Sequence, residues 1–96
     1  MKKDIGKSPL SNELKVACEI YAHNERNETI WFAKLVKTLQ HKLTKIEVER
    51  CINTLFDWGI IRGEYGETID GKAGRTYHID YGSEQLISEM YSQWWK

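Results

Sequence analysis

Cysteine is scarce in this chain of 96 residues, which holds two, far apart in the sequence. Cys18 and Cys51 both lie inside helical patterns, and neither belongs to a Cys-x-x-Cys pair. This spacing argues against a disulfide framework and against a zinc knuckle. We expect both to be small buried residues in a reducing compartment, because unpaired cysteine is among the residue types most often buried.

Long apolar runs are also missing. None approaches the roughly 18 residues that a membrane-spanning helix needs. The first residues, MKKDIGKSPLSNE, are charged but are not followed by the apolar stretch of a signal peptide. A soluble, cytoplasmic protein with no membrane partner is therefore expected. At this length a single core needs most of the chain, so one small domain is predicted.

The chain carries no net charge, because 14 Lys and Arg balance 14 Asp and Glu. Proteins that bind nucleic acid usually have a basic excess that neutralises phosphates, so this balance argues against strong DNA binding by a lone monomer. The charge is nevertheless uneven, and the run from Lys34 to Lys45 holds four lysines and His41 with no acid. Such a run is either a local phosphate-binding patch or the solvated side of a helix.

Apolar residues recur at three- and four-residue spacing in three successive segments, which predicts three helices. Ser8-Pro9 is a favourable start for the first, because serine caps free amides and proline tolerates the first helical position. A β-branched and aromatic run, Thr29 to Trp31, predicts a brief strand before the second helix. Thr44 is a favourable N-cap for the third helix, and Gly59 can end it in the left-handed conformation.

Residues 60–81 predict a β-hairpin. The segment 66–75 contains three glycines and an Asp-Gly pair, which predict the connecting turn. The alternation from Thr76 to Tyr81 predicts the return strand, which pairs with the brief earlier strand as well. Trp58, just before this hairpin, is expected to pack beneath it.

The last apolar pattern predicts a helix over residues 83–96, with Ser83 as its cap. It follows a flexible N-terminus over 1–8 and a main domain over 9–82. Two adjacent tryptophans give this helix more apolar surface than one small domain easily covers. The helix is therefore expected either to pack back on the first helix or to pair with a second copy, and a homodimer is favoured. The residues predicted for that interface are Leu86, Met90, Tyr91, Trp94 and Trp95.

Taken in order, the predicted elements are helix, short strand, helix, helix, strand, turn, strand and helix. Over about residues 9–81 this order resembles the winged helix-turn-helix superfamily, and the Leu-x-x-x-Gly-Ile-Ile ending at 55–61 looks like small MarR- or PadR-type prokaryotic regulators. The Gly-Arg-Thr-Tyr segment at 74–77 adds to the likeness. The resemblance implies an α+β fold: a three-helix core, a β-hairpin wing and an added C-terminal helix. It also implies binding to duplex DNA, with the third helix in the major groove.

Position by position, the resemblance assigns base contacts to the third helix and backbone contacts to the second helix and the wing. Arg50 suits a guanine edge and Asn53 an adenine edge, whereas lysine suits phosphate. Glu47 and Glu49 place negative charge on the same helix, although a glutamate can accept from cytosine. The predicted DNA-binding residues are Lys34, Lys37, His41, Lys42, Thr44, Lys45, Glu47, Arg50, Asn53, Lys72 and Arg75, with Glu49 as a further groove-facing candidate.

Catalysis is not predicted. The three histidines lack metal-ligand spacing, and there is no P-loop, nucleophile elbow or glycine-rich nucleotide fingerprint, so no enzyme activity, metal or cofactor is expected. The expected function is sequence-specific binding of duplex DNA by a transcriptional regulator that occupies an operator. The alternative is a winged-helix adaptor that docks another protein through its neutral surface and exposed aromatics, without binding DNA. The lysines of the second helix separate the two, since only DNA binding requires them.

Overall fold

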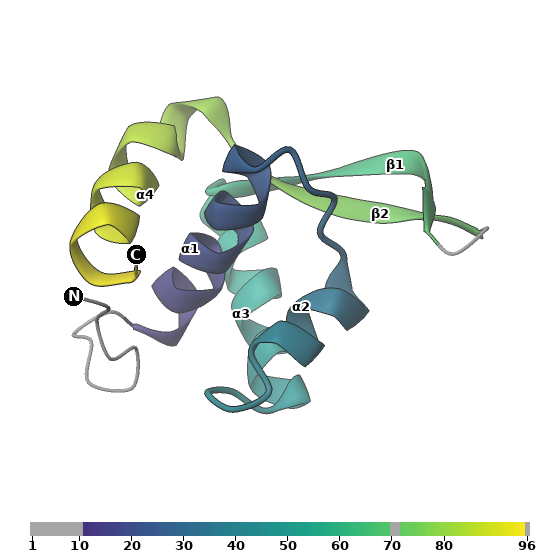
Figure 1. Cartoon of the computed structure of the whole chain (residues 1–96), viewed down its shortest axis with the longest axis horizontal. Coiled ribbons are helices and arrows are strands. Elements are labelled where there is room, and N and C mark those ends of the chain that lie inside the picture. Colours follow the sequence, from purple (N-terminus) through teal and green to yellow (C-terminus); the bar gives the residue numbers. More distant parts are fainter. Residues whose placement is uncertain (1–10, 70–71, 96) are drawn as a thin grey trace.

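A computed structural model describes residues 11–69 and 72–95, the side chains of 65–74 excepted. Three helices, a two-stranded hairpin and a C-terminal helix follow one another (Figure 1). This is the predicted α+β winged-helix architecture, with a three-helix core, a wing and an added helix. Within the described chain, no helix is both long enough and apolar enough to cross a membrane.

Helix α1 spans Asn12–Glu25 and begins later than predicted. Ser11 is its N-cap: the backbone of this residue is extended, and its Oγ accepts a hydrogen bond from the Leu14 amide at 3.3 Å. A helix cannot continue through an extended residue, so α1 starts at Asn12 and the predicted start at Ser8-Pro9 is wrong. Ser8 and Pro9 themselves lie outside the described residues. A turn follows the helix, and Asn27 takes a left-handed φ of 56° in it.

Helix α2 spans Phe32–Thr38, and the brief strand predicted before it is wrong. The Ile30 carbonyl accepts a single backbone hydrogen bond, at 2.9 Å, from the Tyr77 amide in the wing. Neighbouring backbone groups of the wing are paired with the Asn24 side chain, which donates to the Tyr77 carbonyl at 3.3 Å and accepts from the Ile79 amide at 3.0 Å. A side chain from α1 thus takes over pairing that a third strand would supply.

Helix α3 spans Lys45–Asp57 and follows its sequence signals closely. Thr44 is the N-cap as predicted, and Gly59, with φ 73°, is left-handed just beyond the helix end. Trp58 departs from the prediction. It is 57% exposed instead of packed beneath the hairpin.

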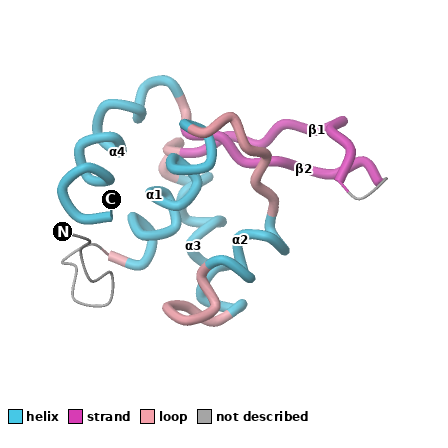
Figure 2. The backbone as a smooth tube through the Cα atoms, in the orientation of Figure 1, coloured by secondary structure: helices cyan, strands magenta, loops and turns pink. Residues whose placement is uncertain are grey.

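The wing consists of β1, Ile61–Ile69, and β2, Lys72–Ile79, paired antiparallel with Ile61 opposite Ile79. The strands are longer than predicted, because pairing continues through most of the segment 66–75 that was expected to form the turn. The predicted Asp-Gly turn pair, 70–71, lies outside the described residues. Figure 2 shows the two strands projecting together beyond the helices.

The C-terminal segment forms a 3-10 turn η2, Tyr81–Ser83, then helix α4, Glu84–Met90, then a π-helical turn η3, Tyr91–Trp95. The Asp80 carboxylate caps η2 by accepting from the Gly82 amide at 3.1 Å. Ser83 makes no side-chain cap bond, so its predicted role is wrong. Asp80, three residues before Ser83, caps the preceding turn η2 instead.

The core lies where α1, α2 and α3 meet the base of the wing, and α4 covers α1 from the other side (Figure 1). Cys18 and Cys51 are both buried in it, as predicted. Burial, helped by the nearby charge of Glu19, raises the pKa of the Cys18 thiol to about 12. Burial likewise raises the pKa of the Cys51 thiol to about 11. Both thiols therefore stay protonated and act as small core residues. The largest fully buried side chains include Ile20, Ile30, Leu35, Leu39, Leu55 and Ile87.

Candidate nucleic-acid interface

One face of α3 is free of the core. Ile46, Glu49, Arg50 and Asn53 fall at helical spacings of three, four and seven residues, and all four are exposed. Within the described part of the chain, the side chains of Glu49 and Asn53 make no hydrogen bond. We call these four residues the reading face. The side chains of Glu49 and Asn53 are therefore available to a ligand without first breaking a hydrogen bond.

The first turn of α3 is fixed by a capping box between Thr44 and Glu47. The Thr44 amide donates to Glu47 Oε1 at 2.9 Å, and the Glu47 amide donates to the Thr44 hydroxyl at 3.2 Å. Asn12 Nδ2 adds a contact of 3.5 Å to Glu47 Oε2, which joins this turn to α1. Of the two glutamates predicted to face a groove, Glu47 is thus occupied by the cap, and Glu49 is the acid on the reading face.

The cap makes one acid-sensitive contribution to stability. The Thr44 amide, with the threonine hydroxyl and more weakly Arg50, lowers the pKa of Glu47 below its ordinary value of 4.5. A lowered folded-state pKa means that this stabilisation is present above pH 4.5 and is lost as the pH falls through the folded value. Glu47→Gln keeps the box without the charge. We expect the melting temperature of the wild type to exceed that of E47Q at pH 7, and the difference to shrink as the pH falls below 4.5. Melting curves followed by circular dichroism would check this, and parallel curves would contradict it.

Basic residues occupy the end of α2, the turn after it and the start of α3, next to the reading face in the sequence. Figure 2 shows the backbone of this turn leading from α2 into α3. Lys37, His41, Lys42 and Lys45 are all exposed, as a phosphate-binding role requires. Lys34 differs, because it is half-buried: its Nζ donates to the Thr29 carbonyl at 3.1 Å and lies 5.1 Å from the centre of the Trp31 ring. The Lys34 ammonium group therefore already has contacts within the protein.

The wing contributes Arg75. Its guanidinium carbon lies 4.8 Å from the centre of the Phe56 ring on α3, and that ring packs edge-on against Tyr77. Gly63 allows this arrangement, since a Cβ at that position would come within 2.7 Å of Arg75 Cδ. Arg75 is therefore brought to α3. Lys72 is the first residue of β2, and its side chain lies outside the described residues.

The residues predicted for a dimer interface make contacts within the chain. The Trp95 indole is buried, and its N–H donates to Glu19 Oε2 at 3.0 Å. The Tyr91 and Tyr21 rings lie 5.3 Å apart. Met90 and Trp94 are half-buried, and Leu86 is 47% exposed. Of the two sequence alternatives, packing on α1 is what the structure shows, and pairing with a second copy stays a prediction.

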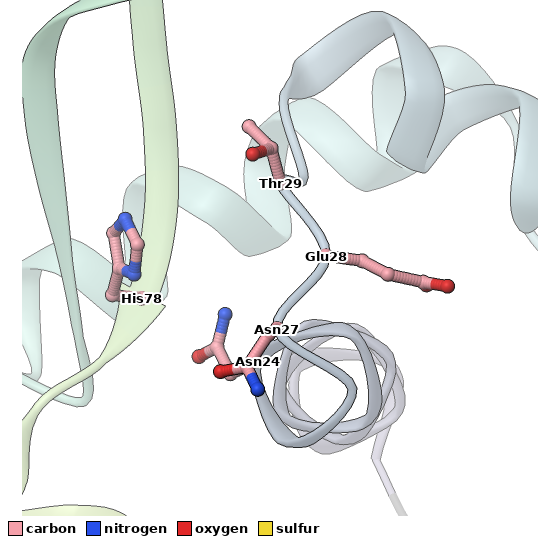
Figure 3. A pocket seen from close by; sticks show the side chains of 5 residues that line it. All are labelled: Asn24, Asn27, Glu28, Thr29 and His78. Atoms are coloured by element: carbon pink, nitrogen blue, oxygen red, sulfur yellow. The ribbon is translucent and has the colours of Figure 1, made fainter.

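A polar hollow lies between the loop after α1 and the wing, away from the reading face. It has a volume of about 260 Å³. Figure 3 shows Asn24 and Asn27 facing it from one side and His78 from the other, with Glu28 directed away. Asn24 is committed to β2, and His78 Nε2 lies 3.0 Å from the Thr76 hydroxyl. Of the side chains around the hollow, Asn24 is the one that joins α1 to the wing. Among the residues with described side chains, no three His, Cys, Asp or Glu gather as a metal site needs.

Sequence reasoning missed two residues that matter here. Asn24 was not singled out, because its bonds to a strand more than 50 residues away have no local signal. Ile46 was passed over because it is apolar. Its position on the polar side of the third helical pattern was a usable signal, since it breaks the amphipathic period there.

The arrangement defines a winged-helix protein, with the third helix exposed beside a basic turn and a wing. Among solved structures, it is similar to the circadian clock associated protein Pex from Anabaena, at 16% identity over 88% of this chain and 77% of that chain, with a TM-score of 0.67. It is also similar to Pex from Synechococcus sp. (strain PCC 7942), at 20% identity over 88% of this chain and 81% of that chain, with a TM-score of 0.59. At such identities the likeness establishes the fold alone. No protein-family model and no curated protein matches the sequence.

Proposed function

We propose that this protein binds duplex DNA sequence-specifically and regulates transcription by occupying an operator. The observation that carries the proposal is the exposed reading face of α3, with basic residues before its first turn and Arg75 of the wing against Phe56 near its last turn. A winged helix with such a face suits a groove of DNA, where a helix enters and flanking residues contact the backbone. The likeness to Pex, a circadian clock associated protein, is compatible with a regulatory role.

The chemistry divides into positioning and reading. Lys37, Lys42 and Lys45 would contact phosphates, which fix the register without carrying sequence information. On the reading face, Arg50 suits guanine and Asn53 suits adenine, while Glu49 can accept from cytosine N4. The Glu47 carboxylate is bound in the helix cap and keeps its charge there, so Glu49 is the acid on this face that is placed to meet a base edge.

The narrower parts of the proposal rest on the sequence argument. They are a MarR- or PadR-type regulator, a homodimer through the last helix, a cytoplasmic location, and no catalysis or cofactor. A homodimer would place two reading faces on a palindromic site and double the effect of a modest basic patch. The exposure of Leu86, at 47%, is compatible with such pairing.

Titration of a labelled mixed-sequence duplex with the full chain, followed by fluorescence anisotropy, tests the proposal. With four or five phosphate contacts, affinity is expected to fall by on the order of 100-fold between 50 and 200 mM salt. Such a slope would support real phosphate contacts and justify a search for the operator. Absence of binding at 50 mM salt would contradict the proposal.

The second candidate is a winged-helix adaptor that docks another protein. Exposed aromatic side chains favour it, namely Trp58 at 57% and Tyr81 at 75% exposure, as does the zero net charge. This function does not require the lysines beside the reading face. It would become the leading candidate if the anisotropy titration showed no binding, and a pull-down with the immobilised chain would then identify the partner.

A further inference from the structure

An isoleucine stands at the N-terminal end of the proposed DNA-reading surface. Ile46, the second residue of α3, is 61% exposed. It lies on the same face as Glu49, Arg50 and Asn53, with Arg50 one helical turn away. The core side of the helix is supplied by Val48, Ile52 and Leu55, so Ile46 is not needed for packing.

This isoleucine is held on a rigid turn. Ile46 lies inside the capping box, because Thr44 and Glu47, which precede and follow it in the sequence, exchange two hydrogen bonds. A β-branched side chain in a helix has one strongly preferred χ1 rotamer, so the position of its methyl groups is largely set in advance. Little conformational entropy would be lost when a ligand contacts it.

The surroundings of Ile46 fit DNA better than a protein partner. The other large exposed apolar residues among the described side chains are Trp58, at the far end of α3, Tyr81 and Leu86. None of them lies on the reading face, so Ile46 is a single apolar side chain among polar ones. Exposed Lys42 and Lys45 are near it in sequence. Protein docking sites need a contiguous apolar area, whereas one apolar group beside lysines matches a base edge between phosphates.

We propose that Ile46 contacts the C5-methyl group of a thymine in the major groove and so makes this protein select a thymine at one position of its site. The major-groove edge of thymine is the one that presents a methyl group, and apolar side chains are its usual partners. This inference rests on the proposed DNA binding. It extends the reading face from three polar side chains to four contacts with distinct base preferences.

The test removes the contacting apolar group from each partner in turn: the C5-methyl from thymine, and the side chain beyond Cβ from Ile46. A duplex site is first selected from a random pool with the full chain, and each thymine in it is then replaced singly by uracil, which lacks the C5-methyl. At one position the substitution is expected to weaken wild-type binding about fivefold, because one methyl is lost from an apolar contact. Ile46→Ala should weaken binding to the thymine site by about the same factor. In I46A, uracil at that position should have no further effect.

The controls separate this inference from the function on which it rests. Trp58→Ala removes another exposed apolar side chain from the same helix, and it should respond to uracil as the wild type does. If every uracil site affects wild type and I46A equally while a sequence is still selected, Ile46 does not read thymine and DNA binding stands. If no sequence is enriched although duplex is bound in the anisotropy titration, selective readout fails. If no duplex is bound, the proposed function and this inference both fail.

Discussion

Replacing both Lys37 and Lys42 with glutamate is expected to abolish DNA binding under conditions in which the wild type binds. Each substitution removes a phosphate contact and introduces a repulsive charge at an exposed position beside the reading face. The combined loss of affinity at 50 mM salt should be on the order of 100-fold or more, and the slope of log affinity against log salt should fall by about two units. Anisotropy titration at several salt concentrations measures both quantities.

A matched control isolates position from net charge. Arg26 is exposed on the loop after α1, where it pairs with Glu28 at 3.0 Å, and Arg26→Glu changes the charge by the same amount as Lys37→Glu. R26E should retain most of the affinity, whereas K37E alone should lose a large part of it. All these side chains are exposed, so the free energy of unfolding should change by about 0.5 kcal/mol or less. Unchanged DNA affinity in the double variant would show that the basic turn is not the phosphate-binding surface.

Trp95→Ala is expected to be the most destabilising single substitution near the C-terminus. The indole is 6% exposed and contributes to the core where η3 meets α1. Its removal leaves a cavity worth about 3–5 kcal/mol, a large part of the roughly 5–15 kcal/mol that stabilises a small domain. It also removes the N–H that donates to Glu19 Oε2 at 3.0 Å. Urea unfolding followed by circular dichroism at 222 nm would measure the loss.

Two further variants separate the contribution of the Trp95 hydrogen bond from that of its buried ring. Trp95→Phe keeps an aromatic ring but no N–H, so its cost should be smaller, about 1–3 kcal/mol for the missing partner of Glu19. Trp58→Ala removes an exposed tryptophan and should cost about 0.5 kcal/mol or less. If W95A were as stable as W58A, the packing of the last turn on α1 would not contribute to stability, and the surface of the C-terminal segment would be left for a partner.

Local signals accounted for the part of the protein that the sequence predicted well. The third helix begins at Thr44 and ends before Gly59 because the cap bonds and the left-handed glycine each involve residues only a few positions apart. The hairpin was predicted from an Asp-Gly pair and an alternating strand, which are also local patterns. The basic run from Lys34 to Lys45 could be recognised in the sequence, because it holds four lysines and a histidine and no acid. These elements define the α+β winged-helix class and most of the candidate site.

Two of the errors arose where competing local signals had similar strength. Ser8-Pro9 and Ser11 are both reasonable helix starts, and the extended backbone of Ser11 decides between them. Ser83 and Asp80 are both capping residues, and the 3-10 turn engages the acid. Propensity alone does not rank two such candidates, because each cap contributes only about 1 kcal/mol.

Contacts between distant residues were settled by the tertiary structure alone. The Thr29–Trp31 segment has strand-like residues, but the wing backbone beside it is paired with Asn24, whose bond partners lie 53 and 55 residues away. The last helix packs on α1 through a bond that joins Trp95 to Glu19 across 76 residues. Glu47 belongs to the helix cap, and Ile46 stands exposed beside it. The sequence by itself determined which segments form helices and strands, because those preferences are set within a few residues. The tertiary structure decided which side chains stay exposed to meet a ligand, because exposure depends on what the rest of the chain covers.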